Sequence, residues 1–327
     1  MKLKNKVYEK LYICEGQYLS GQSFADEFSV TRNAIWKAIN SLKSDGHDIL
    51  CSSKKGYCLS PKTETISAFG IKNELGESNN CHIEVFQKVT STNDMLIDLA
   101  KKGAKEWTVI VAEEQTNGKG RQKRSFFSPI DDGVYFSILL RPSFLIEDAS
   151  MITVMTAAAV TEIIEEKYHI ELKIKWVNDI FKDGKKICGI LTEGSFNVED
   201  GAFDYLVVGI GINLSKPDGG YPKELKDIIA PLFDNKMTAR KKNCLIASIL
   251  ENIYKYYFDM QSKSYLKIYQ NKQYLIGKEV DIYQADKKTA FGKVIGVDDK
   301  GRLMVEANGK IEYLSSGEAR VVAKNNK

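Results

Sequence analysis

The chain contains 327 residues, of which 43% are hydrophobic, and it carries a formal net charge of +4 at pH 7. This length predicts two or three domains with ordinary packed cores. No apolar run reaches the ~18 residues of a membrane span, and no apolar stretch follows the basic N-terminus. We therefore expect a cytoplasmic protein, neither inserted in a membrane nor secreted. The net charge is too small to indicate a nucleic-acid partner, so the positions of the charges matter more.

The six cysteines and three histidines are scattered along the chain. No two cysteines form a Cys-x-x-Cys pair, and no cysteine stands at zinc-ligand spacing from a histidine. The pattern indicates reduced thiols in a cytosolic protein and predicts no metal site built from these residues.

Residues 1–65 are predicted to form a winged helix-turn-helix domain, with three short helices followed by a β-hairpin. Ser20 is a candidate N-cap for a helix over residues 22–28. The next helix is expected to open at Ser29 and to run to about Lys43, because apolar residues recur there at helical spacing. The wing would consist of strands at residues 48–51 and 56–59.

The helix expected over residues 29–43 has a positive face, because this segment contains basic residues and no acid. Such residues, together with lysines of the wing, would contact phosphates, and the start of the helix would reach base edges in a major groove. Ile35 and Trp36 are expected to pack in the core or against other helices. Winged helices also act as protein-interaction modules, so that alternative stays open for the domain alone. The candidate DNA contacts are Thr31, Arg32, Asn33, Lys37, Lys54 and Lys55.

Residues 66–270 are predicted to form an α/β domain. Asp183-Gly184 is a strong signal for a two-residue β-hairpin. Because such hairpins are frequent, we expect a mixed sheet flanked by helices rather than an all-parallel sheet. The expected strands are residues 83–89, 107–112, 133–140, 172–176, 187–192 and 205–210, and the expected helices are residues 93–101, 149–168 and 243–260.

Residues 271–327 are predicted to form a small SH3-like β-barrel. Turn signals at residues 299–301 and at Asn308-Gly309 separate short alternating strands. The expected strands are residues 279–283, 290–297, 303–306, 311–314 and 318–322.

A cationic segment with two glycines, Gly118 and Gly120, lies between two of the expected strands of the central domain. Glycine lets the backbone approach a ligand closely. Four cations crowd together here without an acid, which favours a bound anion such as a polyphosphate or an acyl phosphate. For charge and glycine content alone, a solvated surface loop is an equally good interpretation. The four cations are Lys119, Arg121, Lys123 and Arg124.

Two further segments combine strand-like residues with polar ends. Residues 175–179 read Lys-Trp-Val-Asn-Asp, and residues 207–213 form an apolar run with Gly209 and Gly211 that ends in Asn213. Taken alone, each has an ordinary explanation, as turn residues in the first case and as tight sheet packing in the second.

Together and in this order, these segments resemble those of biotin–protein ligases, most closely the bifunctional kind that also represses the biotin operon. Residues 118–124, Gly-Lys-Gly-Arg-Gln-Lys-Arg, are similar to the family's Gly-Arg-Gly-Arg-Arg-Gly-Arg loop. Residues 175–179 resemble its Lys-Trp-Pro-Asn-Asp motif, and residues 91–93 resemble its biotin-contacting Ser-Thr-Asn. The resemblance covers essentially the whole chain.

The resemblance implies an enzyme that uses biotin and ATP, with Mg²⁺, to form biotinyl-AMP and then transfers biotin to a lysine of a biotin carboxyl carrier protein. It also implies a homodimer that binds operator DNA. Arg121 and Lys186 would be the catalytic residues, at the phosphate and the activated carboxyl. The expected biotin contacts are Ser91, Thr92, Asn93, Gln115, Gly118, Lys119, Gly120, Arg121, Lys186 and Gly189. The expected ATP contacts are Lys119, Arg121, Arg124, Phe126, Lys175, Asn178, Asp179 and Asn213.

The chain departs from the family pattern at several of these positions. Such changes bear on affinity and loop dynamics more than on the reaction, since lysine keeps the charge of arginine but loses its bidentate geometry. Two alternatives stay open: a lipoate or octanoate ligase of the same fold, and a biotin-sensing regulator without transferase activity. The departures are Lys119 and Gln122 in place of arginines, Lys123 in place of glycine, Phe126 in place of tryptophan and Val177 in place of proline.

Overall fold

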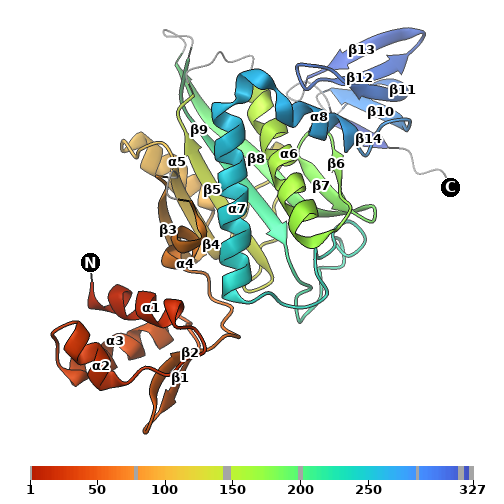
Figure 1. The fold of residues 1–327 in the computed structure, drawn as a ribbon. Coiled ribbons are helices and arrows are strands. Elements are labelled where there is room, and N and C mark those ends of the chain that lie inside the picture. Colours follow the sequence, from red (N-terminus) through yellow and green to blue (C-terminus); the bar gives the residue numbers. More distant parts are fainter. Residues whose placement is uncertain are drawn as a thin grey trace.

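The computed structural model describes residues 2–76, 80–142, 149–197, 202–284, 287–315 and 320–323. Along the chain it contains a small unit of helices with a hairpin, a large sheet with helices on both faces, and a small antiparallel sheet (Figure 1). This is the α/β architecture expected from the sequence, with the winged helix-turn-helix at the N-terminal end. None of the helices within these ranges is both long and apolar enough to cross a bilayer.

The N-terminal unit consists of α1 (Leu3–Ile13), α2 (Gly21–Glu27), α3 (Arg32–Ser44), β1 (Ile49–Ser52) and β2 (Gly56–Leu59). Two of its helices begin at capping side chains. The sequence predicts this for Ser20 before α2, whose Oγ accepts a hydrogen bond from Ser23 N at 2.9 Å. Thr31 caps α3 in the same way, accepting from Ala34 N at 3.2 Å. The unit has an apolar core of its own, to which all three helices contribute.

Two expectations for α3 were wrong. The helix begins at Arg32 rather than at Ser29, because Thr31 serves as its N-cap. Trp36 is 54% exposed, whereas the neighbouring Ile35 is completely buried. Successive helical residues lie ~100° apart around the axis, so Trp36 points outward from α3 although Ile35 points into the core.

The central sheet consists of β3 (His82–Val89), β4 (Thr108–Gln115), β5 (Gly133–Leu140), β6 (Lys173–Lys175), β7 (Asp179–Lys182), β8 (Lys185–Asn197) and β9 (Ala202–Asn213). The strand order is β3-β4-β5-β9-β8-β7-β6. β3 and β4 pair in parallel and the other neighbours pair antiparallel, so the sheet is mixed, as expected. The turn between β7 and β8 is the predicted hairpin, since Asp183 and Gly184 have φ values of 50° and 79°, as a primed turn requires.

Helices cover both faces of this sheet; they are α4 (Ala68–Glu74), α5 (Thr92–Lys101), α6 (Ala149–Tyr168), α7 (Ala239–Phe258) and α8 (Ser264–Asn271). α6 and α7 lie across one face (Figure 1), in a core shared with Val109 and Ile138. α5 packs on the opposite face, in a core shared with Ile110 and Leu139. Adjacent strand residues point to opposite faces, which explains why β4 and β5 read as almost continuous apolar runs. The sequence analysis missed α4 and α8, and it placed the start of α7 at Asn243.

The C-terminal sheet consists of β10 (Glu279–Gln284), β11 (Lys287–Val297), β12 (Leu303–Ala307), β13 (Lys310–Leu314) and β14 (Arg320–Ala323). Its strands are antiparallel in the order β13-β12-β11-β10-β14. Asn308 and Gly309 form the expected turn, with φ values of 52° and 73°. Residues 318 and 319 of the last expected strand lie outside the described residues. Trp176 joins this sheet to the central domain, because its indole N–H donates to Gly301 O at 3.0 Å.

Residues 60–67, here called the linker, connect the N-terminal unit to the central domain. Buried polar groups hold this linker against the central domain. Glu113, near the end of β4 and 4% exposed, accepts a hydrogen bond from Ile66 N at 2.6 Å. Lys242 of α7, 1% exposed, donates to Glu64 O at 3.2 Å and to Asp131 O at 3.1 Å. Burial raises the pKa of Glu113 to about 7, although the Ile66 hydrogen bond and Lys242 oppose this rise.

We expect Glu113→Gln to change the pH dependence of stability. The ordinary pKa of this carboxyl group is 4.5, and its pKa in the folded protein is about 7. The folded state therefore binds the proton more tightly, and stability is lost as the pH rises through this interval, by up to ~3 kcal/mol at ~1.4 kcal/mol per pKa unit. The variant lacks this loss, so its free energy of unfolding relative to wild type should rise across the interval in denaturant titrations. Parallel pH curves for the two proteins would contradict this role.

Candidate active site

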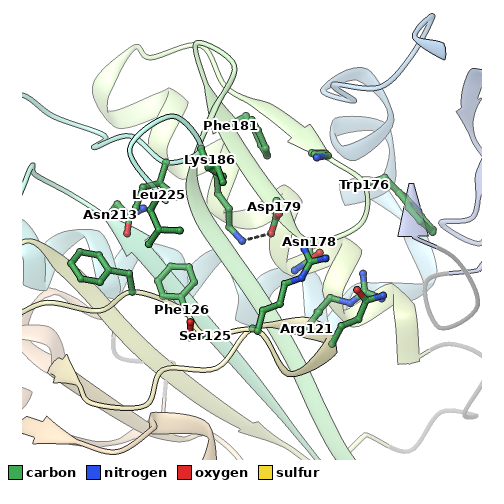
Figure 2. Close-up of a pocket in the computed structure, with 17 residues that line it drawn as sticks. Arg121, Ser125, Phe126, Trp176, Asn178, Asp179, Phe181, Lys186, Asn213 and Leu225 are labelled. Atoms are coloured by element: carbon green, nitrogen blue, oxygen red, sulfur yellow. Dashed lines mark ion pairs between the residues drawn. The ribbon is translucent and has the colours of Figure 1, made fainter. Parts of the chain in front are cut away.

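Two adjoining pockets lie between the start of α5, strands β7 to β9 and a hairpin formed by residues 118–126, here called the cationic loop. The wide pocket has a volume of 350 Å³, within the ~300–1,000 Å³ typical of small-molecule sites. The narrow pocket has a volume of 50 Å³. Arg121, Phe126, Asn178 and Lys186 line both pockets and therefore stand at their junction (Figure 2).

The start of α5 forms one wall of the narrow pocket. Ser91 is the N-cap of this helix, and its Oγ accepts a hydrogen bond from Asp94 N at 3.4 Å. Thr92 donates to Gln115 Oε1 twice, from its backbone N at 2.9 Å and from its Oγ1 at 3.1 Å. Gln115 Nε2 in turn donates to Ser128 Oγ at 3.0 Å, which fixes the orientation of the amide. Polar groups gather here because a helix begins here.

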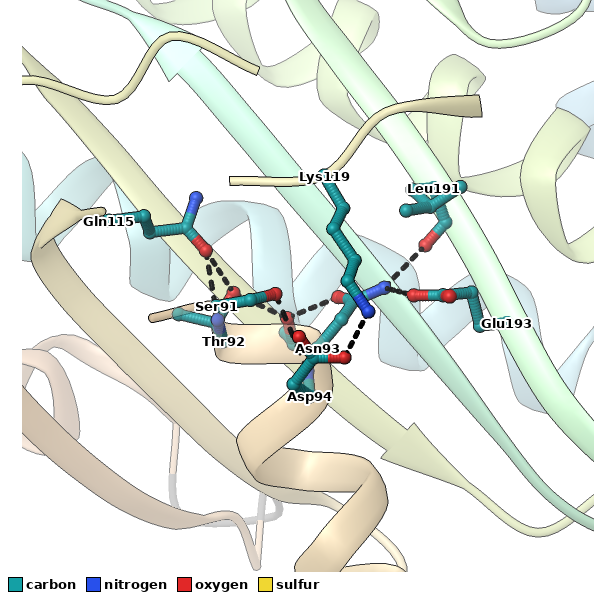
Figure 3. A network of polar contacts seen from close by, with 9 residues as sticks. Ser91, Thr92, Asn93, Asp94, Gln115, Lys119, Leu191 and Glu193 are labelled. Atoms are coloured by element: carbon teal, nitrogen blue, oxygen red, sulfur yellow. Dashed lines mark hydrogen bonds and ion pairs between the residues drawn. The ribbon is translucent and has the colours of Figure 1, made fainter. Parts of the chain in front are cut away.

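Asn93 belongs to a further hydrogen-bond network on the same wall (Figure 3). Its Nδ2 donates to Glu193 Oε2 at 2.7 Å and to Leu191 O at 3.3 Å. Ser137 Oγ lies 2.6 Å from Asn93 Oδ1 and 2.7 Å from Thr92 Oγ1. Both amide hydrogens of Asn93 are therefore used within the protein, which leaves mainly acceptor capacity for a ligand. The sequence analysis missed Ser137 and Glu193, although a serine within an apolar strand is a signal for a polar contact.

Glycines of β8 and β9 leave room for the side chains of Asn93 and Phe126. A Cβ atom at Gly209 would lie 2.2 Å from Asn93 Oδ1. A Cβ atom at Gly211 would lie 2.5 Å from the Phe126 ring, and one at Gly189 would lie 3.0 Å from it. Glycine within these strands therefore marks the close approach of side chains from α5 and from the cationic loop.

The cationic loop folds back on itself as a small hairpin. Gly120 N donates to Arg124 O at 2.7 Å, and Phe126 N donates to Gly118 O at 2.8 Å. Gln122 stands at the turn with a φ of 55°, in the left-handed region. This geometry brings the backbone of Gly120 and the side chain of Arg121 to both pockets.

The wide pocket contains more cations than acids. Lys186 Nζ lies 2.7 Å from Asp179 Oδ1 and 5.6 Å from the centroid of the Phe126 ring. Burial lowers the pKa of Lys175 and of Arg121, and Asp179 opposes this effect on both. A partly desolvated excess of positive charge is suited to an anion such as a phosphate group. Among the described residues that line this pocket, one carboxylate, that of Asp179, faces four cations: Arg121, Arg124, Lys175 and Lys186.

The outer wall of the wide pocket comes from residues 225–229, which the sequence analysis did not identify. Lys186 N donates to Ile228 O at 2.9 Å, and Ala230 N donates to Lys186 O at 3.0 Å, so this segment is fixed to the start of β8. Leu225, Ile228 and Ile229 offer an apolar surface to a flat ring. The segment shows neither helical nor strand periodicity, so its pattern gave no signal.

Most of the candidate ligand contacts come together at these pockets. The expected biotin contacts line the narrow pocket with one exception, Gly118, which lines a third pocket beside the cationic loop. The expected ATP contacts line the wide pocket with one exception, Lys119, which lines the narrow pocket. The candidate DNA contacts are all exposed. The side chain of Lys123 lies outside the described part of the structure.

We expect Gly209→Ala to weaken ligand binding in the narrow pocket. The new Cβ atom would collide with Asn93 Oδ1, so the Asn93 network or β9 must shift. Overpacking of this kind costs ~1–3 kcal/mol, which corresponds to about 5- to 150-fold weaker biotin binding if the strain falls on the pocket. Calorimetry would measure the affinity. Gly219→Ala is the matched control, since its Cβ would meet nothing within 4 Å. Equal affinities in the two variants would contradict the prediction.

Comparisons with known proteins agree with this geometry. The model of the biotin/lipoate A/B protein ligase family matches residues 85–213, a helix-turn-helix domain model matches residues 4–58, and a biotin protein ligase C-terminal domain model matches residues 275–321. Among solved structures, a biotin protein ligase from Aquifex aeolicus in complex with biotin and ATP is similar with a TM-score of 0.62 and 27% identity. That similarity covers 74% of this chain and 99% of the Aquifex chain.

Two curated relatives extend the similarity over nearly the whole chain. The bifunctional ligase/repressor BirA of Escherichia coli is 25% identical over 94% of each chain. The protein of the same name from Bacillus subtilis is 32% identical over 97% of this chain and 98% of its own length. The chain therefore belongs to the BirA family of bifunctional ligase/repressors.

Proposed function

We propose that the chain is an ATP-dependent biotin–protein ligase that forms biotinyl-AMP and transfers biotin to a lysine of a biotin carboxyl carrier protein. The observation that carries this proposal is the junction between a narrow polar pocket and a wide cationic pocket, with Arg121 and Lys186 on both. A ligand in each pocket would present its reacting group at that junction. The Aquifex aeolicus ligase, described in complex with biotin and ATP, supports this pair of substrates.

The reaction requires stabilisation of negative charge rather than a nucleophilic side chain. First, a carboxylate oxygen of biotin bonds to the α-phosphorus of ATP, and the bond to the bridging oxygen of the β-phosphate breaks, which releases pyrophosphate. Then the amine of the carrier lysine attacks the biotinyl carbonyl carbon, the bond to AMP breaks, and the amine loses a proton. Both steps increase the charge on phosphate oxygens, where fixed cations lower the barrier.

Arg121 and Lys186 are the residues to which we assign the catalytic roles. Arg121 would hold the phosphate, and Lys186, which is paired with Asp179 in the free protein, would contact the activated carboxyl group. Mg²⁺ would arrive with ATP and take its main ligands from the phosphates. Within the described ranges, no three His, Cys, Asp or Glu side chains form a group that would hold a metal ion.

We assign the ureido ring of biotin to the narrow pocket and ATP to the wide pocket. A ureido group both donates and accepts hydrogen bonds, which suits the hydroxyl and amide groups of residues 91–93 and of Gln115. The dithiolane ring of lipoate offers no such groups and would leave buried polar atoms without partners. This difference favours biotin over lipoate or octanoate. The apolar wall at residues 225–229, together with Phe126, would flank the adenine.

The rest of the chain would serve regulation and assembly. We propose a DNA-binding domain at residues 1–65, a catalytic domain at 66–270 and a C-terminal domain at 271–327. The DNA-binding domain would repress transcription at a biotin operator, as the helix-turn-helix match and the names of the relatives suggest. A palindromic operator would call for a homodimer, favoured when the adenylate orders the cationic loop. We propose a cytoplasmic location, because ATP, the carrier protein and the operator would all be present there.

We expect Lys186→Ala to slow adenylate formation ~10²–10³-fold, because a fixed cation at the junction is lost. Pyrophosphate release with biotin and ATP measures the first step, and transfer of labelled biotin to a purified carrier domain measures the second. Lys185→Ala is the matched control, since Lys185 Nζ donates to Lys226 O at 3.2 Å in an exposed contact. A normal rate in Lys186→Ala would contradict the assigned role. If the wild-type protein binds biotin without transferring it, the protein is instead a biotin-sensing regulator. If it prefers lipoate to biotin as a substrate, it is instead a lipoate ligase.

We expect two DNA-binding variants to differ in kind. Lys54→Ala should weaken binding to all duplexes alike and reduce the salt slope by ~1, since Lys54 would contact a phosphate. Arg32→Ala should reduce discrimination between a duplex selected by the wild-type protein and a scrambled one. Titrations at several salt concentrations, with and without biotin plus ATP, would separate these effects, and sedimentation of the same samples would test the dimer. Failure of the wild-type protein to select any duplex would contradict the repressor role.

A further inference from the structure

An ion pair joins the cationic loop to the helix on the opposite wall of the narrow pocket. Lys119 Nζ contacts Asp94 Oδ1 (Figure 3). Asp94 lies in the first turn of α5, directly after the residues assigned to the ureido ring. Lys119 and the start of α5 line the narrow pocket together. The ion pair therefore bridges two walls that come from different parts of the chain.

Backbone hydrogen bonds fix the internal shape and the base of the cationic loop, and the ring of Phe126 at its end contacts Lys186. Gly120 N donates to Arg124 O at 2.7 Å within the hairpin, and Asn117 N donates to Thr90 O at 2.8 Å just before it. Neither bond reaches α5, which begins at Thr92. The ion pair does act on the distance between the loop and α5, because it links the first strand of the hairpin directly to the helix.

Asp94 also has a competing local explanation. An acid in the first turn of a helix interacts favourably with the helix dipole, whatever the loop does. The cap itself needs only the backbone of Asp94, which donates to Ser91 Oγ. However, the hydrogen bond with Asp94 has the largest effect on the pKa of Lys119, which it raises. The two explanations predict different behaviour of the loop when the carboxylate is removed.

We infer that Asp94 is a positioning residue that holds the cationic loop closed over the acyl-adenylate and so limits the escape of this intermediate. The inference rests on the proposed function, because only an active ligase forms the intermediate. An escaped adenylate acylates amines in solution: a bond forms between nitrogen and the acyl carbon, the bond to AMP breaks, and the amine releases its proton to water. Both side chains of the pair are 37% exposed, so its strength is that of a salt-screened surface pair.

The test compares full-length wild type, Asp94→Asn and Asp94→Glu, each loaded with labelled biotin and ATP. A chase with unlabelled biotin measures the release of the adenylate, and labelling of a bystander protein measures its escape. We expect release to be about two- to fivefold faster in Asp94→Asn, the effect of losing an exposed ion pair. Asp94→Glu should restore slow release. Added salt should accelerate release from wild type towards the rate of Asp94→Asn, and should change the variant little.

The controls separate this role from a general effect on stability. Glu114→Gln breaks a comparable ion pair on the neighbouring strands, Lys88 Nζ to Glu114 Oε1 at 2.8 Å, and should leave release unchanged. In a Lys119→Met background, Asp94→Asn should not accelerate adenylate release further, even if Asp94→Asn lowers the melting temperature. Equal release from Asp94→Asn and wild type, or equal acceleration by Glu114→Gln, would overturn the inference alone. Wild-type protein that forms no adenylate would overturn the proposed function, and this inference with it.

Discussion

Electrostatic balance around Asp179 is the constraint on which the rest of this site depends. Asp179 pairs with Lys186 at 2.7 Å, and it also opposes the effect of burial on Arg121 and Lys175. One carboxylate cannot neutralise all the cations that line the wide pocket, so the free protein holds an excess of positive charge next to a polar pocket. Such an excess is tolerable at a partly open site and strongly favours an anionic ligand. A bound nucleotide would restore the charge balance, because its negative phosphates would compensate the excess positive charge.

The sheet brings the contributors to this balance together, although they come from distant parts of the chain. Asp179 begins β7, Lys186 lies near the start of β8, and Asn213 ends β9. β4 ends nearby and connects two functions over three residues: Glu113 holds the linker of the DNA-binding unit, and Gln115 accepts from Thr92 in the narrow pocket. A change in the pocket therefore has a short covalent route to the linker. Contiguous contacts of this kind can carry energetic coupling between a ligand site and a distant unit.

Local patterns in the sequence were enough for much of the fold. Capping at Ser20 and the primed turns at Asp183-Gly184 and Asn308-Gly309 all act over a few residues, and the structure confirms them. The order of the motifs was likewise enough for the family. Trp36 was placed wrongly, because composition does not reveal which side of a small helical unit faces its core. The short helices α4 and α8 were missed, since segments of 7 and 8 residues are too short to stand out as periodic helices in the sequence.

By itself, therefore, the sequence determined the element types, the mixed sheet, the family and the set of cations at residues 119–124. Only the tertiary structure decided which groups meet. It paired Lys119 with Asp94 and Asn93 with Glu193, it brought Ser137 of β5 to Asn93, and it closed the wide pocket with residues 225–229. The physical reason is range. Capping, turn geometry and periodicity depend on neighbours along the chain, whereas pairing of charges and sharing of hydrogen bonds depend on distances that exist only once the sheet has assembled.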